Sequence, residues 1–258
     1  MSFASSYLAD ASLFALAVSR IAGFVVVSPF PGQNVSMSQR IGLVVVLAWV
    51  AASFAPGRES LPGLGLGLAG WAAIELGCGI VIGVAFRFVF AAAEMLGSML
   101  GLASGLGTPS VFNPTLDAQE TPIGRIIGLL GMLLALGIGT HRVAIGALLD
   151  SFRAIPVGTP VALDAPLVAF VDLAIDAFVV GVRLATPVIA VNVVVNASLA
   201  MISRAAPSLQ IFSVGFGILI GSTTLTLLAC LPDLTAGLSS HFERLATTLD
   251  AALAAAKK

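Results

Sequence analysis

The apolar residues of this chain fall in long runs that short polar interruptions separate, which is the pattern of a membrane protein rather than of a soluble domain. The longest run without a charge or a proline covers residues 208–231. A bilayer core about 30 Å thick is crossed by about 20 apolar residues of helix. The pattern therefore predicts a membrane-spanning helix in this run.

The remaining apolar runs contain prolines, amides or charges. They cover residues 13–29, interrupted by Arg20; 41–56, after Arg40; 64–90, interrupted by Glu75 and Arg87; 126–148, interrupted by His141 and Arg142; 166–185, interrupted by Asp172, Asp176 and Arg183; and 184–203, interrupted by Pro187, Asn192 and Asn196. We predict an all-α protein with about six or seven hydrophobic helices, several of them long and broken or paired as helical hairpins.

The C-terminal segment has a different pattern. Residues 238–258 repeat apolar side chains at spacings of three and four, with Glu243, Arg244 and Asp250 on other faces. This spacing predicts an amphipathic helix that lies on a surface or docks on a partner.

Composition agrees with the membrane class. Hydrophobic residues make up 58% of the 258 residues, only 10% are charged, and the mean hydropathy is +1.07. The formal net charge is -1, so nothing indicates a nucleic-acid partner, which would require a clustered basic surface. The first ten residues lack the basic region of a signal peptide, so we expect the first apolar segment to be retained.

Charged groups inside apolar runs must face protein or water, because exposing one to lipid costs about 2.5–3.5 kcal/mol or more. This applies to Arg20, Glu75, Arg87 and the later group Asp172, Asp176 and Arg183. The spacing of the later group places all three on one helical face. It favours an ion-pair stripe over a proton relay, and either arrangement needs a partner surface or an aqueous lumen.

The chain has no recognisable catalytic or metal-binding pattern. Cys78 and Cys230 each lie alone in an apolar run and are expected to be buried, and His141 and His241 lack metal-ligand spacing and are expected at helix ends. The letters GLGLAG at 65–70 match a dinucleotide-binding motif but lead into a membrane-type run. We expect no enzyme activity, no metal and no cofactor.

Three polar or proline-interrupted places are candidates for function, and one of them is the turn SPFPGQNVSMSQR at 28–40. Arg204 precedes Pro207, and the residue before a proline is biased away from helix, which predicts a turn at Ala206 in a helical hairpin. The stretch GLASGLGTPSVFNPTLDAQET at 101–121 combines glycines and prolines that prevent a continuous helix. Composition alone favours a plain surface connection there.

Several stretches together resemble one known family. They are RIAGFVVVSPFPG, FAAAEMLGSMLGL, the FNP and TP pairs before Arg125, GTHR with SFRAIPVG, and the run RLATPVIAVNVVVNASLAMISRAAPSLQIFSVGFG. This series is similar to the FliR family of flagellar biosynthetic proteins and covers roughly residues 15–230. The most specific part is residues 196–217.

The resemblance implies one copy of this chain in a pore that also contains FliP-type and FliQ-type proteins. It implies a FliP-like half over residues 1–125, with a plug loop at 101–122, and a FliQ-like half over residues 126–258. Further expected partners are FlhB-type and FlhA-type export proteins and unfolded flagellar substrates. The expected location is the bacterial inner membrane, in the flagellar basal body, with part of the assembly above the bilayer plane.

The resemblance also reverses the preference for a surface loop at 101–121 and implies that this loop closes the pore. The expected plug residues are Gly105, Gly107, Pro109, Val111, Phe112, Asn113, Pro114 and Pro122. The residues expected in subunit contacts or structural roles are Arg20, Arg40, Glu75, Arg87, Glu94, Arg125, Asp172, Asp176, Arg183, Asn196, Arg204 and Pro207.

Three alternatives stay open at the level of sequence. The family includes a corresponding subunit of virulence type III secretion systems. Broken helices with charges are also typical of a small secondary transporter, although no internal repeat is visible. An intramembrane enzyme is a third possibility, with Asp172 and Asp176 as its only paired acids.

Overall fold

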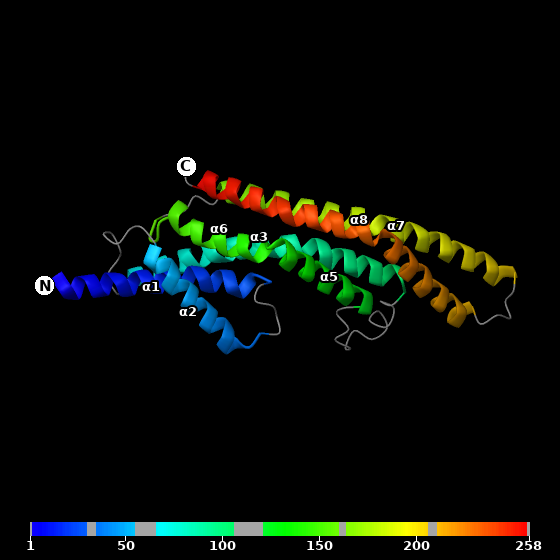
Figure 1. Cartoon of the computed structure of the whole chain (residues 1–258), viewed down its shortest axis with the longest axis horizontal. Helices are drawn as coiled ribbons and strands as arrows, with labels where there is room; N and C mark the ends of the chain where they lie inside the picture. Colours follow the sequence, from blue (N-terminus) through cyan, green and yellow to red (C-terminus); the bar gives the residue numbers. More distant parts are fainter. Residues whose placement is uncertain are drawn as a thin grey trace. The chain divides into compact units, whose positions relative to one another are not determined.

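The computed structural model describes residues 2–29, 35–54, 66–105, 121–159, 164–205 and 211–256. Within these ranges the chain forms seven α-helices (Figure 1). They are α1 (Ser2–Val27), α2 (Met37–Phe54), α3 (Leu66–Ala103), α5 (Pro122–Ile138), α6 (Thr140–Ala154), α7 (Asp164–Ala205) and α8 (Ile211–Ala256). The all-α prediction is confirmed.

Several predicted interruptions do not end a helix. The helix α3 continues through Glu75 and Arg87, α7 continues through Pro187, and α8 continues through Pro232. The amphipathic C-terminal segment is therefore the last part of α8 and not a separate helix, and His241 lies within α8 rather than at its end. A helix accepts a proline when surrounding groups satisfy the backbone carbonyl that the proline leaves free.

Among the described residues, three helices are long and apolar enough to cross a membrane. The candidate spans are Gly67–Ala103, Val171–Ala205 and Val214–Arg244. The consecutive helices α5 and α6 supply a fourth candidate if they are counted as one broken span. Gly139 stands at this break with φ of +87°, a conformation that glycine adopts without steric cost.

The described residues divide into two compact units. The first unit draws on residues 1–89, 139–174 and 244–258 and contains α1, α2, the first part of α3 and α6. Its core includes the edge-to-face pair Phe24 and Phe86, with ring centroids 5.9 Å apart. Two glycines bring α1 and α3 together, because a Cβ on Gly23 would clash with the backbone of Leu76, and one on Gly79 with that of Arg20.

The second unit draws on residues 90–138 and 175–243 and contains the end of α3, α5 and most of α7 and α8. Here α3 and α5 approach closely at Gly97 and Gly124, where an added Cβ on Gly97 would lie 2.9 Å from the Gly124 backbone. The rings of Phe90 and Phe242 pack 5.5 Å apart between α3 and α8. Small residues thus supply the helix contacts in both units, as membrane proteins require.

Candidate functional site

A buried ion pair joins α1 to α3 in the first unit. Arg20 is fully buried, Glu75 is 1% exposed, and Arg20 Nε donates to Glu75 Oε2 at 2.5 Å. The guanidinium also lies over the ring of Phe152 from α6, 4.4 Å from the ring centroid. The prediction that these two charges face protein is confirmed by their burial.

The same pair holds the C-terminal end of α6. Arg20 Nη1 donates to the carbonyls of Ser151 at 3.0 Å and Ile155 at 3.1 Å, and the amide of Gly158 donates to Glu75 Oε1 at 3.1 Å. The Ser151 carbonyl also accepts the amide of Ile155 at 2.9 Å, so Arg20 adds a second hydrogen bond there and supplies one to the Ile155 carbonyl just beyond the helix end. Three segments distant in sequence are thereby fixed to one another.

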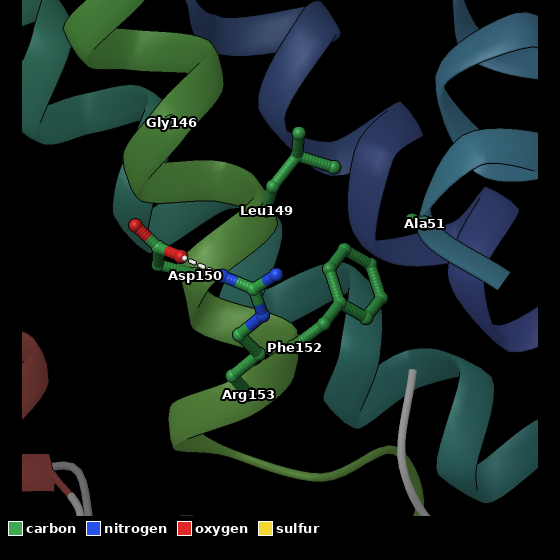
Figure 2. A pocket seen from close by; sticks show the side chains of 6 residues that line it. All are labelled: Ala51, Gly146, Leu149, Asp150, Phe152 and Arg153. Atoms are coloured by element: carbon green, nitrogen blue, oxygen red, sulfur yellow. Dashed lines mark hydrogen bonds and ion pairs between the residues drawn. The ribbon is translucent and has the colours of Figure 1, made fainter. Parts of the chain in front are cut away.

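A small cavity lies beside this network. The cavity has a volume of about 210 Å³. It is lined by Ala51 of α2 and by residues of α6 (Figure 2). The α6 residues that line it are Gly146, Leu149, Asp150, Phe152 and Arg153. Arg153 Nη1 and Asp150 Oδ1 form an ion pair at 3.1 Å, and both side chains are well exposed. In the part of the chain that the structure describes, no three His, Cys, Asp or Glu side chains are placed to hold a metal ion.

In the second unit α7 and α8 form an antiparallel hairpin, which we call the α7–α8 hairpin (residues 175–205 and 211–243). Its interior holds a polar cluster of Asn192, Ser222 and Thr223. Asn192 Nδ2 donates to Thr223 Oγ1 at 2.9 Å, and Ser222 Oγ donates to Asn192 Oδ1 at 3.0 Å. Thr223 Oγ1 in turn donates to the carbonyl of Leu219 at 2.8 Å. Asn192 and Thr223 are both buried, so the cluster satisfies its polar atoms internally.

A second polar contact crosses the same hairpin. His241 Nδ1 lies 2.9 Å from Asp176 Oδ2, with the histidine side chain 1% exposed and the aspartate 35% exposed. Asp176 thus faces a histidine that the sequence pattern did not connect with it. Asp172 and Arg183, the other members of the expected stripe, are exposed.

Both ends of the expected plug loop are held at one place in the second unit. Gly105 follows the end of α3 at Ala103 and has φ of +76°, and a Cβ added there would contact Phe216 and Leu219 of α8. A Cβ on Gly101 would clash with Thr121, whose hydroxyl accepts the amide of Gly124 at 3.1 Å at the beginning of α5. Of the expected plug residues, Gly105 and Pro122 are described, and Gly107, Pro109, Val111, Phe112, Asn113 and Pro114 lie outside the described residues.

The other residues expected in subunit contacts lie mainly on the surface of the chain. Arg40 is partly exposed, and Pro207 lies outside the described ranges. The exposed members are Arg87, Glu94, Arg125, Asn196 and Arg204. The structure therefore brings Arg20 and Glu75 together and leaves most of the remaining expected contact residues on the outside.

Sequence reasoning missed the residues that complete these sites. Ser151 and Ile155 act through their backbone carbonyls, which no side-chain pattern reveals. Asn192 was visible only as an interruption, and its partners Ser222 and Thr223 follow in the next helix. Pairing amides and hydroxyls across an expected hairpin is the signal that identifies such a cluster.

Comparisons of the sequence with known proteins identify one family. The family model described as "Bacterial export proteins, family 1" matches residues 11–245. The flagellar biosynthetic protein FliR of Pectobacterium carotovorum is 29% identical over 83% of this chain and 82% of its own length. FliR of Escherichia coli K12 is 26% identical over 91% of this chain and 90% of its own length. FliR of Bacillus subtilis is 27% identical over 84% of this chain and 85% of its own length.

The family match extends from α1 into the last part of α8 and so includes the buried Arg20–Glu75 pair, the α7–α8 hairpin and the three candidate spans. The relatives are matched over most of their own lengths. The chain therefore belongs to bacterial export protein family 1, the FliR family, and three of its described helices are long and apolar enough to cross a membrane.

Proposed function

We propose that this chain is a pore subunit of the flagellar protein export gate. Its relatives are named flagellar biosynthetic proteins, which favours the flagellar role over the virulence type III one. The proposed setting is the inner membrane at the flagellar basal body, with FliP-type and FliQ-type proteins as partners in the pore. FlhB-type and FlhA-type proteins and unfolded flagellar subunits are the further proposed partners.

The observation that carries the proposal is the large apolar surface that the α7–α8 hairpin leaves uncovered. In an 18-residue apolar stretch of each span, only 22% of the residues in α7 and 17% in α8 are buried within the chain. The exposed side chains include Phe178, Val179, Val193, Val194, Met201, Val214, Leu225 and Leu228. Such a surface is covered by neighbouring subunits or by lipid.

Charges and amides on the same helices favour subunits over lipid. Arg183 and Asn196 of α7 are exposed within a candidate span. Polar groups in such spans face protein or water, because lipid cannot satisfy them. The hairpin thus has the surface of a subunit whose neighbours supply polar partners.

The proposal includes a plug role for residues 104–121. Irregular backbone at membrane depth is tolerated only where protein buries it or where it lines a water-filled cavity. Gly101, Thr121 and Gly124 hold the two ends of this segment together. We assign the closing function to the segment between these ends, with Val111 and Phe112 as apolar stoppers.

Complementation in a flagellated bacterium that lacks its own FliR tests the function. The chain should restore motility and secretion of hook or filament subunits, together with its native FliP-type and FliQ-type partners where the host's do not assemble with it. A variant lacking residues 108–118 should assemble with these partners but make the membrane permeable to small ions. Assembly without any leak would refute the plug role, and failure to restore secretion despite full assembly would refute the export role.

A further inference from the structure

The polar cluster of Asn192, Ser222 and Thr223 lies where an apolar hairpin has no other visible need for polarity. Residues 184–203 of α7 and 211–231 of α8 carry no charge. Asn192 is 2% exposed and Thr223 is fully buried, so neither side chain is presented to water or to a partner. A buried polar group is costly unless its hydrogen bonds are made, and here Asn192 makes them with α8.

The hydrogen bonds of the cluster form a directed chain. The amide Nδ2 of Asn192 donates to Thr223 Oγ1, which donates onward to the Leu219 carbonyl. The Ser222 hydroxyl donates back to Asn192 Oδ1. A shift of α8 by one turn, about 5.4 Å, would break every interhelical bond in this set and bring an aliphatic side chain, Leu219 or Leu227, to the place of Thr223, so that Asn192 Nδ2 would lose its buried acceptor.

Two prolines separate this cluster from the other polar contact of the hairpin. Asp176 and His241 meet toward the opposite end, roughly 24 Å along α7 from Asn192. Pro187 lies between Asp176 and Asn192 on α7, and Pro232 lies between Thr223 and His241 on α8. Each proline removes a backbone hydrogen bond from its helix. The Asp176–His241 contact therefore does not rigidly fix how α7 and α8 are aligned on the far side of the two prolines. Figure 1 shows that α8 changes direction along its length.

We propose that Asn192, with Thr223 and Ser222, is the positioning residue that sets the register of α7 against α8 beyond the two prolines. The neighbouring inward side chains, Val188 and Leu219, are aliphatic and buried, and aliphatic contacts of this kind tolerate a shift of one turn. A single buried asparagine is an effective register device because only one alignment satisfies its amide. The exposed Asn196, one turn further along, does not share this role.

Disulfide crosslinking within the assembled complex tests the proposal, in a background with Cys78→Ser and Cys230→Ser. The pair Val188→Cys with Leu227→Cys reports the register seen here, and Val188→Cys with Leu231→Cys reports a shift of one turn. Adding Asn192→Leu should lower the first crosslink several-fold and raise the second. Adding Asn196→Leu, the matched control, should leave the ratio of the two crosslinks unchanged.

A gentler pair of variants covers the case in which Asn192→Leu does not accumulate. Thr223→Val has nearly the same shape but no hydroxyl and should shift the crosslink ratio, whereas Thr223→Ser keeps the hydroxyl and should not. An unchanged ratio in both Asn192→Leu and Thr223→Val would overturn the proposal. An equal change in the crosslink ratio with Asn196→Leu would also overturn the proposal, because the effect would then follow from replacing any amide side chain on α7. Neither outcome bears on whether the complex exports protein.

Discussion

Arg20 and Glu75 form a fully buried ion pair between α1 and α3, and together they hold the end of α6. Removing a buried charge partner is costly because the remaining charge stays in a low-dielectric interior. We predict that Arg20→Met or Glu75→Gln lowers the free energy of unfolding by about 3–5 kcal/mol. The loss should appear as a lower thermal midpoint of the purified complex and a lower level of the chain in membranes.

The control for this prediction is the exposed pair Asp150 and Arg153. Exposed ion pairs contribute little to stability, so Arg153→Met should leave the midpoint nearly unchanged. Equal losses in Arg20→Met and Arg153→Met would contradict the structural role of the buried pair.

The close contact of α1 and α3 gives a second prediction. A Cβ on Gly79 would overlap the backbone carbonyl of Arg20, whereas a Cβ on Gly77 would meet nothing within 4 Å. Gly79→Ala should therefore destabilise the first unit by about 1–3 kcal/mol or more, because the obstacle is backbone and cannot rotate away. Gly77→Ala should be neutral or slightly stabilising, since alanine favours helix. Thermal midpoints that respond alike to both substitutions would count against the packing.

The hairpin contact between Asp176 and His241 gives a third prediction. Asp176→Ala leaves the buried His241 Nδ1 without the carboxylate that it contacts at 2.9 Å. We expect a loss of about 1–3 kcal/mol in the free energy of unfolding, the cost of leaving a buried polar atom unsatisfied. Asp172→Ala, on an exposed side chain of the same helix, is the control and should have a much smaller effect. Unfolding midpoints in detergent distinguish the two.

The turn that follows α3 gives a fourth prediction. Gly105 has φ of +76°, and a side chain there would also press on Phe216 and Leu219. Gly105→Ala should cost about 1–2 kcal/mol from backbone conformation alone. Gly217→Ala, where an added Cβ meets nothing within 4 Å, should cost little. A neutral Gly105→Ala variant would show that α3 ends differently in the assembled protein.

Much of the fold was predictable because membrane-length apolar runs and their few charges constrain it strongly. The end of α7 at Ala205 followed from Pro207, and the burial of Arg20 and Glu75 followed from the cost of exposing a charge to lipid. Pro187 was misleading as an interruption of the apolar run, because α7 continues through it. A proline breaks a helix in water more readily than in a packed or membrane setting, where neighbours satisfy the freed carbonyl.

The candidate sites were less predictable, because their contacts join residues distant in sequence. Periodicity placed Asp172, Asp176 and Arg183 on one face, but the partner of Asp176 is His241 in another helix. Likewise, the glycine pattern indicated close packing without showing that Gly79 faces Arg20 while Gly77 faces open space. Local patterns give the face of a helix, and the pairing of faces depends on the whole chain.

We propose that this chain functions as one subunit of an export-gate complex. Purification from native flagellated membranes through a tag on this chain tests that role. Mass spectrometry of the intact complex should show one copy of this chain together with several copies each of FliP-type and FliQ-type proteins. Recovery of the chain as a stable monomer, with neither type of partner and with its α7–α8 hairpin surface covered only by detergent, would contradict the account.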